Sequence, residues 1–395
     1  MHKNLFEEIS LELWLILACV SERLDKAEHL LQWDINWDLL IDLSVHHRVY
    51  PIIYRSLKSL NKEAVPEHVL RLLKQKYKSN AMRTISMTGE TIRILKQLES
   101  QGVSAFILKG LPLACRLYGD IAVRPSKDID IFFPPNQLEK AINIIEREGY
   151  KRIEPDYPLV AGQLQRYLKY NHHFKYWQRD QNIHLELHWK LGNIGLEIPP
   201  QGTKINRIVV AGYPVAVFSN EEWLLYLIFH GAGHAWFRIR WLVDIAKFVQ
   251  KGGIDWEKVV SLAKNMGILP LLHQTLILTN MLLSIPVPTN IEPSLAKDRY
   301  AWNLVRLTVP FLSNTDLEAQ YTKRDWLYRR RYYELQFQIG WKNKINYIFH
   351  LFQPLRDDMR IISLPNKLYM VYYFIRPFSW FMRCIRDMWQ HNKTS

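Results

Sequence analysis

Residues 127–133 read Lys-Asp-Ile-Asp-Ile-Phe-Phe, and residues 183–189 read Ile-His-Leu-Glu-Leu-His-Trp. Both stretches alternate apolar and polar residues, which is typical of strands with one buried face. The alternation places the carboxylates of Asp128 and Asp130 on one face of the first strand, about 7 Å apart. It also places Glu186 on the polar face of the second strand, so a neighbouring strand can supply a third carboxylate.

Three converging carboxylates predict a site for a divalent cation. Magnesium prefers oxygen ligands and keeps several of its waters, which suits carboxylates that face a phosphate. We therefore expect Asp128, Asp130 and Glu186 to hold Mg²⁺ or Mn²⁺.

A turn suited to phosphate binding precedes these strands. The apolar residues 105–108 end at Lys109-Gly110, and residues 111–118 are then expected to form a helix. Glycine lets the backbone approach a phosphate, and a helix N-terminus offers free amide donors. Lys109, the Gly110 backbone and Arg124 are therefore predicted to contact a polyphosphate.

These motifs resemble those of the uncharacterised nucleotidyltransferase family of the polymerase-beta superfold. The similar segments are His47-Arg48-Val49-Tyr50-Pro51, Leu108-Lys109-Gly110, Leu117-Tyr118, Arg124, Asp128-Ile129-Asp130, residues 185–189, residues 230–236, residues 240–246 and Arg376-Pro377. The resemblance implies an α+β fold, in which a small mixed β-sheet nucleotidyltransferase core is flanked by N-terminal and C-terminal helical regions. It also implies transfer of a nucleoside monophosphate from a nucleoside triphosphate, expected to be ATP, to an acceptor hydroxyl.

The resemblance assigns a role to each candidate residue. Asp128 and Asp130 would hold the metals that clamp the α-phosphate and leaving group, and Glu186 would assist the acceptor hydroxyl. The residues expected to contact the nucleotide are Lys109, Gly110, Arg124, His188 and His234. Two departures stand out, because the superfold usually has Gly-Ser or Gly-Gly where this chain has Lys109-Gly110, and aspartate where it has Glu186.

Other functions fit the same residues. A toxin-like relative that adds nucleotides to transfer RNA is indicated by Lys109-Gly110, residues 124–128 and a basic tail. A nucleotide-binding or scaffold protein would keep the fold without catalysis. A metal-dependent glycosyltransferase also uses Asp-x-Asp, but its fold would begin with a longer strand-helix series. Fold resemblance does not choose between small-molecule, peptide, protein and RNA acceptors.

Charge and composition point to a folded protein with anionic partners. The formal net charge is +14, and residues 301–395 contain 15 Lys and Arg against 7 Asp and Glu. This aromatic, basic tail is expected to pack as a helical domain, to stack on single-stranded nucleic acid, or to lie on an acidic membrane. No transmembrane segment is expected, because the most apolar span, residues 368–385, contains Arg376, Pro377 and Arg383.

The cysteines predict a reducing compartment. Cys19, Cys115 and Cys384 are odd in number and far apart, which argues against a disulfide framework and a cysteine-based zinc site. Residues 1–8 carry acids where a secretory signal would carry positive charge. We therefore expect a cytoplasmic protein.

Periodicity divides the chain into three regions. These are an N-terminal helical region over 1–85, a catalytic core over 86–220 and a C-terminal helical region with the basic tail over 221–395. The expected core elements are helices over 87–98, 111–118 and 137–148, strands over 103–108, 127–133, 173–178 and 183–189, and a strand or hairpin over 209–218. Helices follow over 229–249 and 255–283, after an N-cap signal at Ser219.

His230 and His234 are four residues apart on one face of a predicted helix, a spacing that zinc sites also use. The metalloprotease glutamate is missing after His230, so packing beside the active site is the favoured interpretation. Arg240 and Asp244 repeat the spacing, and we expect an ion pair between them.

Overall fold

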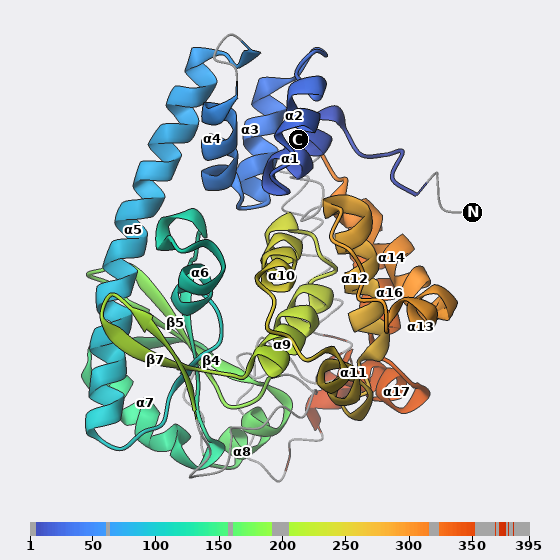
Figure 1. Ribbon diagram of the computed structural model, residues 1–395. Helices are drawn as coiled ribbons and strands as arrows, with labels where there is room; N and C mark the ends of the chain where they lie inside the picture. The colour runs from blue at the N-terminus through green and yellow to red at the C-terminus, as the bar shows by residue number, and fades with distance from the viewer. Residues whose placement is uncertain are drawn as a thin grey trace.

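The computed structural model describes residues 5–60, 64–156, 161–191, 205–315, 324–351 and a few positions between 368 and 382. A small mixed β-sheet lies below a group of N-terminal helices and beside a group of C-terminal helices (Figure 1). This arrangement confirms the predicted α+β fold.

The N-terminal region is helical. Its helices are α1 (Leu11–Val20), α2 (Leu24–Leu30), α3 (Trp37–His46), α4 (Tyr50–Ser59) and α5 (Glu67–Ser100). Helix α5 runs along one side of the molecule, from the N-terminal helices to the far edge of the sheet (Figure 1). The expected helix over 87–98 is therefore the second half of α5, and the predicted division at residue 85 falls inside a continuous helix.

The central sheet contains the two strands that carry the acids. Its strands are β1 (Phe106–Ile107), β2 (Asp128–Phe132), β3 (Lys151–Glu154), β4 (His173–Gln178) and β5 (Ile183–His188), in the order β1-β2-β5-β4-β3. Strands β2 and β5 are parallel, and the other neighbours are antiparallel. Helices α6 (Leu111–Tyr118), α7 (Leu138–Arg147) and α8 (Ala161–Tyr170) and the 3₁₀ turns Ile121–Val123 and Pro135–Gln137 connect them. The expected hairpin is β6 (Asn206–Val210) and β7 (Tyr213–Val217).

The C-terminal region is helical. Its helices are α9 (Asn220–Gly233), α10 (Ile239–Lys251), α11 (Trp256–Asn265), α12 (Leu269–Leu283), α13 (Glu292–Lys297), α14 (Arg299–Leu312), α16 (Arg324–Phe337) and α17 (Trp341–Leu351). Helix α9 begins with the expected cap, because Ser219 and Glu222 form a capping box. The expected helix over 229–249 is broken between α9 and α10, where Ala235 and Trp236 have φ angles of 50° and 54°.

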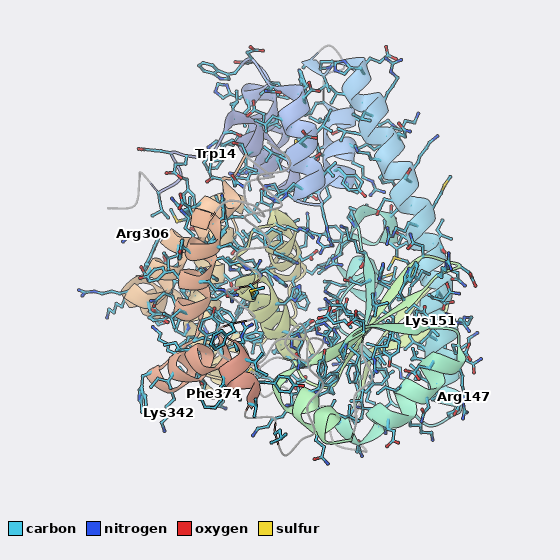
Figure 2. The ribbon with its side chains drawn as sticks, turned by 180° about the vertical axis from the view of Figure 1, so that it is seen from behind. Trp14, Arg147, Lys151, Arg306, Lys342 and Phe374 are labelled. Atoms are coloured by element: carbon cyan, nitrogen blue, oxygen red, sulfur yellow. The ribbon has the colours of Figure 1, made fainter. Side chains whose placement is uncertain are left out.

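Two buried apolar clusters hold these layers together. One joins the N-terminal helices to helices α9–α14, and the other fills the space between the sheet, α5 and α7. Trp223 of α9 links the sheet to the C-terminal helices, because its Nε1–H donates a 2.6 Å hydrogen bond to the Leu108 carbonyl. Arg147 and Lys151 lie on the outer side of the sheet region, across the molecule from Lys342 (Figure 2).

Two further expectations concern the membrane and the cysteines. Within the described ranges, no helix is both long and apolar enough to cross a membrane. Much of the apolar span over 368–385 lies outside the described residues. Cys19 and Cys115 are free thiols, and Cys384 lies outside the described residues.

Candidate active site

The parallel pairing of β2 with β5 brings the three predicted acids together. Asp130 is the register partner of Glu186, so both side chains lie on one face of the sheet with Asp128. One carboxylate oxygen from each of Asp128, Asp130 and Glu186 lies within 4.8 Å of the others. Asp130 is only 1% exposed, which places the group at the floor of the site.

Lys109 supplies the nearest positive charge. Just after the end of β1, the Leu108 N–H donates to the Asp130 carbonyl. The ammonium of Lys109, the next residue, lies 3.1 Å from Asp130 Oδ1. Burial alone would lower the pKa of Lys109, but the carboxylates of Asp130, Asp128 and Glu186 outweigh it and raise that pKa. Lys109 is therefore charged at neutral pH.

His188 lies between two of the acids. Its Nε2 atom is 3.2 Å from Glu186 Oε2 and 3.4 Å from Asp130 Oδ1. Burial opposes charging of His188, but the hydrogen bonds to Asp130 and Glu186 raise its pKa overall. Burial likewise opposes ionisation of Glu186, but His188 and Lys109 lower its pKa overall, so Glu186 carries its negative charge.

The donor atoms fit a hard divalent cation. Asp128, Asp130 and Glu186 offer only oxygen ligands, which Mg²⁺ and Mn²⁺ prefer. Both carboxylate oxygens of Asp130 are buried; Oδ1 faces Lys109 and His188, and Oδ2 has no hydrogen-bond partner among the described residues. Buried polar atoms normally have such a partner, and a bound cation would provide one.

The predicted phosphate turn lies beside the start of β2. Gly110 precedes α6 with a φ of 76°, a conformation that favours glycine. A Cβ atom at Gly110 would lie 3.6 Å from Ser126 Oγ, so the β1–α6 turn approaches the loop that leads to Asp128.

Arg124 is committed to a partner that the sequence did not predict. Its guanidinium donates three hydrogen bonds of 2.8–3.0 Å to both carboxylate oxygens of Asp244, and the Tyr118 hydroxyl donates a fourth at 2.9 Å. The predicted ion pair between Arg240 and Asp244 is therefore wrong, and Arg240 instead donates to the Pro125 carbonyl. These contacts attach α10 to the loop before β2. Direct contact between Arg124 and phosphate stays a prediction.

His230 and His234 lie at the edge of the same site. Their rings are 4.8 Å apart, and both contact Trp241, with His234 stacked on it at 5.0 Å. Among the described residues, neither histidine belongs to a group that could hold a metal, which favours packing over zinc. Both line a cavity of about 220 Å³ together with His172, His188, Tyr226 and Phe337.

The sequence interpretation missed His172 and His173. His173 pairs in register with His188 across β4 and β5, and its Nε2 atom lies 4.0 Å from Glu186 Oε1. Ligand atoms of His173, Glu186 and His188 also lie within 4.8 Å of one another. The alternation of residues 173–178 places His173 on a polar face, but only the strand order shows that this face adjoins Glu186.

Comparisons with known proteins extend this picture. A family model described as "Uncharacterised nucleotidyltransferase" matches residues 34–284. The crystal structure of ANT(2")-Ia in complex with adenylyl-2"-tobramycin is similar at 18% sequence identity and a TM-score of 0.34, over 46% of this chain and 97% of that chain. No curated protein matches the chain.

Proposed function

The chain belongs to the uncharacterised nucleotidyltransferase family, and from this premise we propose a magnesium-dependent enzyme that transfers a nucleoside monophosphate to an acceptor hydroxyl. The donor in this proposal is a nucleoside triphosphate, with ATP as the expected substrate. The observation that supports it best is the convergence of Asp128, Asp130 and Glu186 beside the charged Lys109.

Asp128, Asp130 and Glu186 are the residues that would hold magnesium. When bound, the ions would neutralise phosphate charge and make the acceptor hydroxyl easier to deprotonate. Asp130 is fixed on β2 next to Glu186 on β5, so the rigid sheet sets the spacing of these ligands. Lys109 keeps its charge and offsets the negative charge that gathers at the site.

The proposed reaction is an in-line displacement at the α-phosphorus. The acceptor oxygen forms a bond to this phosphorus while the bond to the oxygen bridging the α- and β-phosphates breaks. Pyrophosphate leaves with that electron pair, and the acceptor proton moves to the ionised Glu186 carboxylate. His188 holds Glu186 through a 3.2 Å contact and keeps it oriented for this step.

Transfer of label from α-labelled nucleoside triphosphates into acceptors of a cell extract tests the proposal. We expect labelling that requires Mg²⁺ or Mn²⁺, and a loss of about 100-fold or more in Asp130→Asn and Glu186→Gln, because even outer partners of metal ligands cost 10–100-fold. Glu22→Gln is the matched control, since Glu22 is exposed on the N-terminal region. Equal labelling by the wild-type protein and Asp130→Asn would overturn the proposal.

A further inference from the structure

A large cationic cavity opens next to the proposed metal ligands. Its volume is about 720 Å³, and it lies between the C-terminal end of α3, one face of α5, the loop before β2 and the start of α10. Helices α3, α5 and α10 are labelled in Figure 1. The basic residues in its lining are Arg48, Lys76, Arg83, Lys127 and Arg238. No acidic residue lines it among the parts of the chain that are described.

The charges at the centre of this cavity repel one another. The side chains of Arg48 and Lys127 have no hydrogen bond or ion pair with the residues that the structure describes. Burial and then the nearby Arg238 lower the pKa of Arg48 to about 10. An anion placed between these groups would relieve the repulsion.

Arg48 occupies a backbone position where glycine is usual. It follows α3 with a φ of 56°, its N–H bonds to the Val45 carbonyl, and the next N–H bonds to the Ser44 carbonyl. This is the left-handed helix end that glycine normally provides, and a long side chain there is strained. Strained backbone positions of this kind cluster at active sites and ligand-binding segments.

The cavity meets the proposed active site at Asp128. Lys127 and Ser126 line it directly before Asp128, and the Ser126 hydroxyl lies beside Gly110 of the phosphate turn. Arg48 is close enough for Asp128 to raise its pKa. Glu186 lies on the neighbouring strand beside Asp130 and His173, and it does not line the cavity. A triphosphate bound beside Asp128 can therefore extend into the cavity.

We propose that this cavity binds the β- and γ-phosphates of the nucleoside triphosphate, so that the N-terminal helical region completes the nucleotide site. The inference rests on the proposed function. Arg48, Lys127 and Arg238 are the phosphate contacts. Arg124, held by Asp244, fixes the loop that carries Lys127.

Binding of inorganic tripolyphosphate to the full chain, measured by titration calorimetry, tests this site without turnover. Arg48→Gly removes the charge and suits the backbone conformation, so it should fold. Lys127→Gln removes a second charge at the surface of the cavity. We expect each change to weaken binding roughly tenfold, as for loss of a charge-assisted hydrogen bond. Lys74→Gln and Lys78→Gln are matched controls, because these exposed residues of α5 lie outside the cavity lining, and they should change the Kd by less than about twofold.

Equal tripolyphosphate affinity in the wild-type protein and Arg48→Gly would overturn the inference. Binding of single-stranded RNA at this cavity, with no binding of tripolyphosphate, would also overturn the inference and would indicate a nucleic-acid partner. A raised KM for the triphosphate in Arg48→Gly, with little change in kcat, would support it. Nucleotide transfer with an unchanged KM in this variant would leave the proposed function standing and remove the phosphate site. If tripolyphosphate binding depends on Arg48 but neither the wild-type protein nor any variant transfers a nucleotide, the phosphate site would stand and the proposed function would fail.

Discussion

Replacing Asp244 with alanine should destabilise the protein severely. Arg124 is 3% exposed and gives three hydrogen bonds to Asp244, so the change would leave its guanidinium charge buried without a counter-ion. It would also remove the acceptor of the Tyr118 hydroxyl. Breaking one side of a buried ion pair costs about 3–5 kcal/mol, a large part of the about 5–15 kcal/mol that stabilises a typical folded protein.

Urea unfolding followed by tryptophan fluorescence measures this loss. With an m value near 3 kcal/mol/M, the midpoint should fall by about 1 M or more. Glu22→Gln is the control, because the Lys247–Glu22 pair has a short contact of 2.5 Å but its glutamate side chain is 71% exposed. Such a surface pair contributes about 0–1 kcal/mol.

A midpoint for Asp244→Ala that matches Glu22→Gln would refute this reasoning. A double variant, Arg124→Met with Asp244→Leu, separates lost charge compensation from lost packing. It should recover part of the stability, because no unpaired charge remains in the interior. If the double variant is less stable than Asp244→Ala, packing rather than the lone charge would be the cause.

Three further predictions concern packing, helix propensity and pH. Gly231→Ala should lower the melting temperature and cost about 1–3 kcal/mol of unfolding free energy, because its Cβ would lie 2.2 Å from the buried Trp236 ring. Gly89→Ala meets nothing within 4 Å on α5, so it should raise the melting temperature by adding about 0.5–1 kcal/mol of unfolding free energy. An unchanged melting temperature in Gly231→Ala would contradict the first expectation. Burial lowers the pKa of His46 to about 4, so the unfolded chain takes up its proton first, near pH 6.5. Stability from this residue is present above pH 6.5 and is lost as the pH falls toward 4. His46→Gln can still donate to the Phe237 carbonyl, as the His46 ring does, and should flatten the urea midpoint between pH 4 and 7. Parallel profiles for the two proteins would exclude this role.

Features encoded by local spacing could be predicted from the sequence. The alternation around Asp128, Asp130 and Glu186 gave both strands within one residue of their observed ends, and it placed the acids on the correct faces. The expected helix over 111–118 and the cap at Ser219 were also confirmed. Each of these depends on residues no more than a few positions apart.

Features that depend on distant segments could not be predicted in this way. Arg124 and Asp244 are 120 residues apart, and the local helical spacing in α10 pointed to Arg240 instead. Arg124 donates to both carboxylate oxygens of Asp244. Arg240, on the same helix as Asp244, does not make this contact. The cationic cavity has the same origin, because α3, α5, α10 and the loop before β2 meet only in the folded chain.

The length of α5 imposes a limit on how this family member can vary. Its 34 residues span about 50 Å as one straight element, with Lys76, Asn80 and Arg83 facing the cavity and Ile94 and Leu98 packed in the sheet core. Each residue inserted between these two sets would turn one set by about 100° relative to the other. A single insertion or deletion near Gly89 would thus swing the basic side chains out of the cavity while both ends of the helix stayed intact. The number of residues along this stretch is therefore fixed by the geometry of the site.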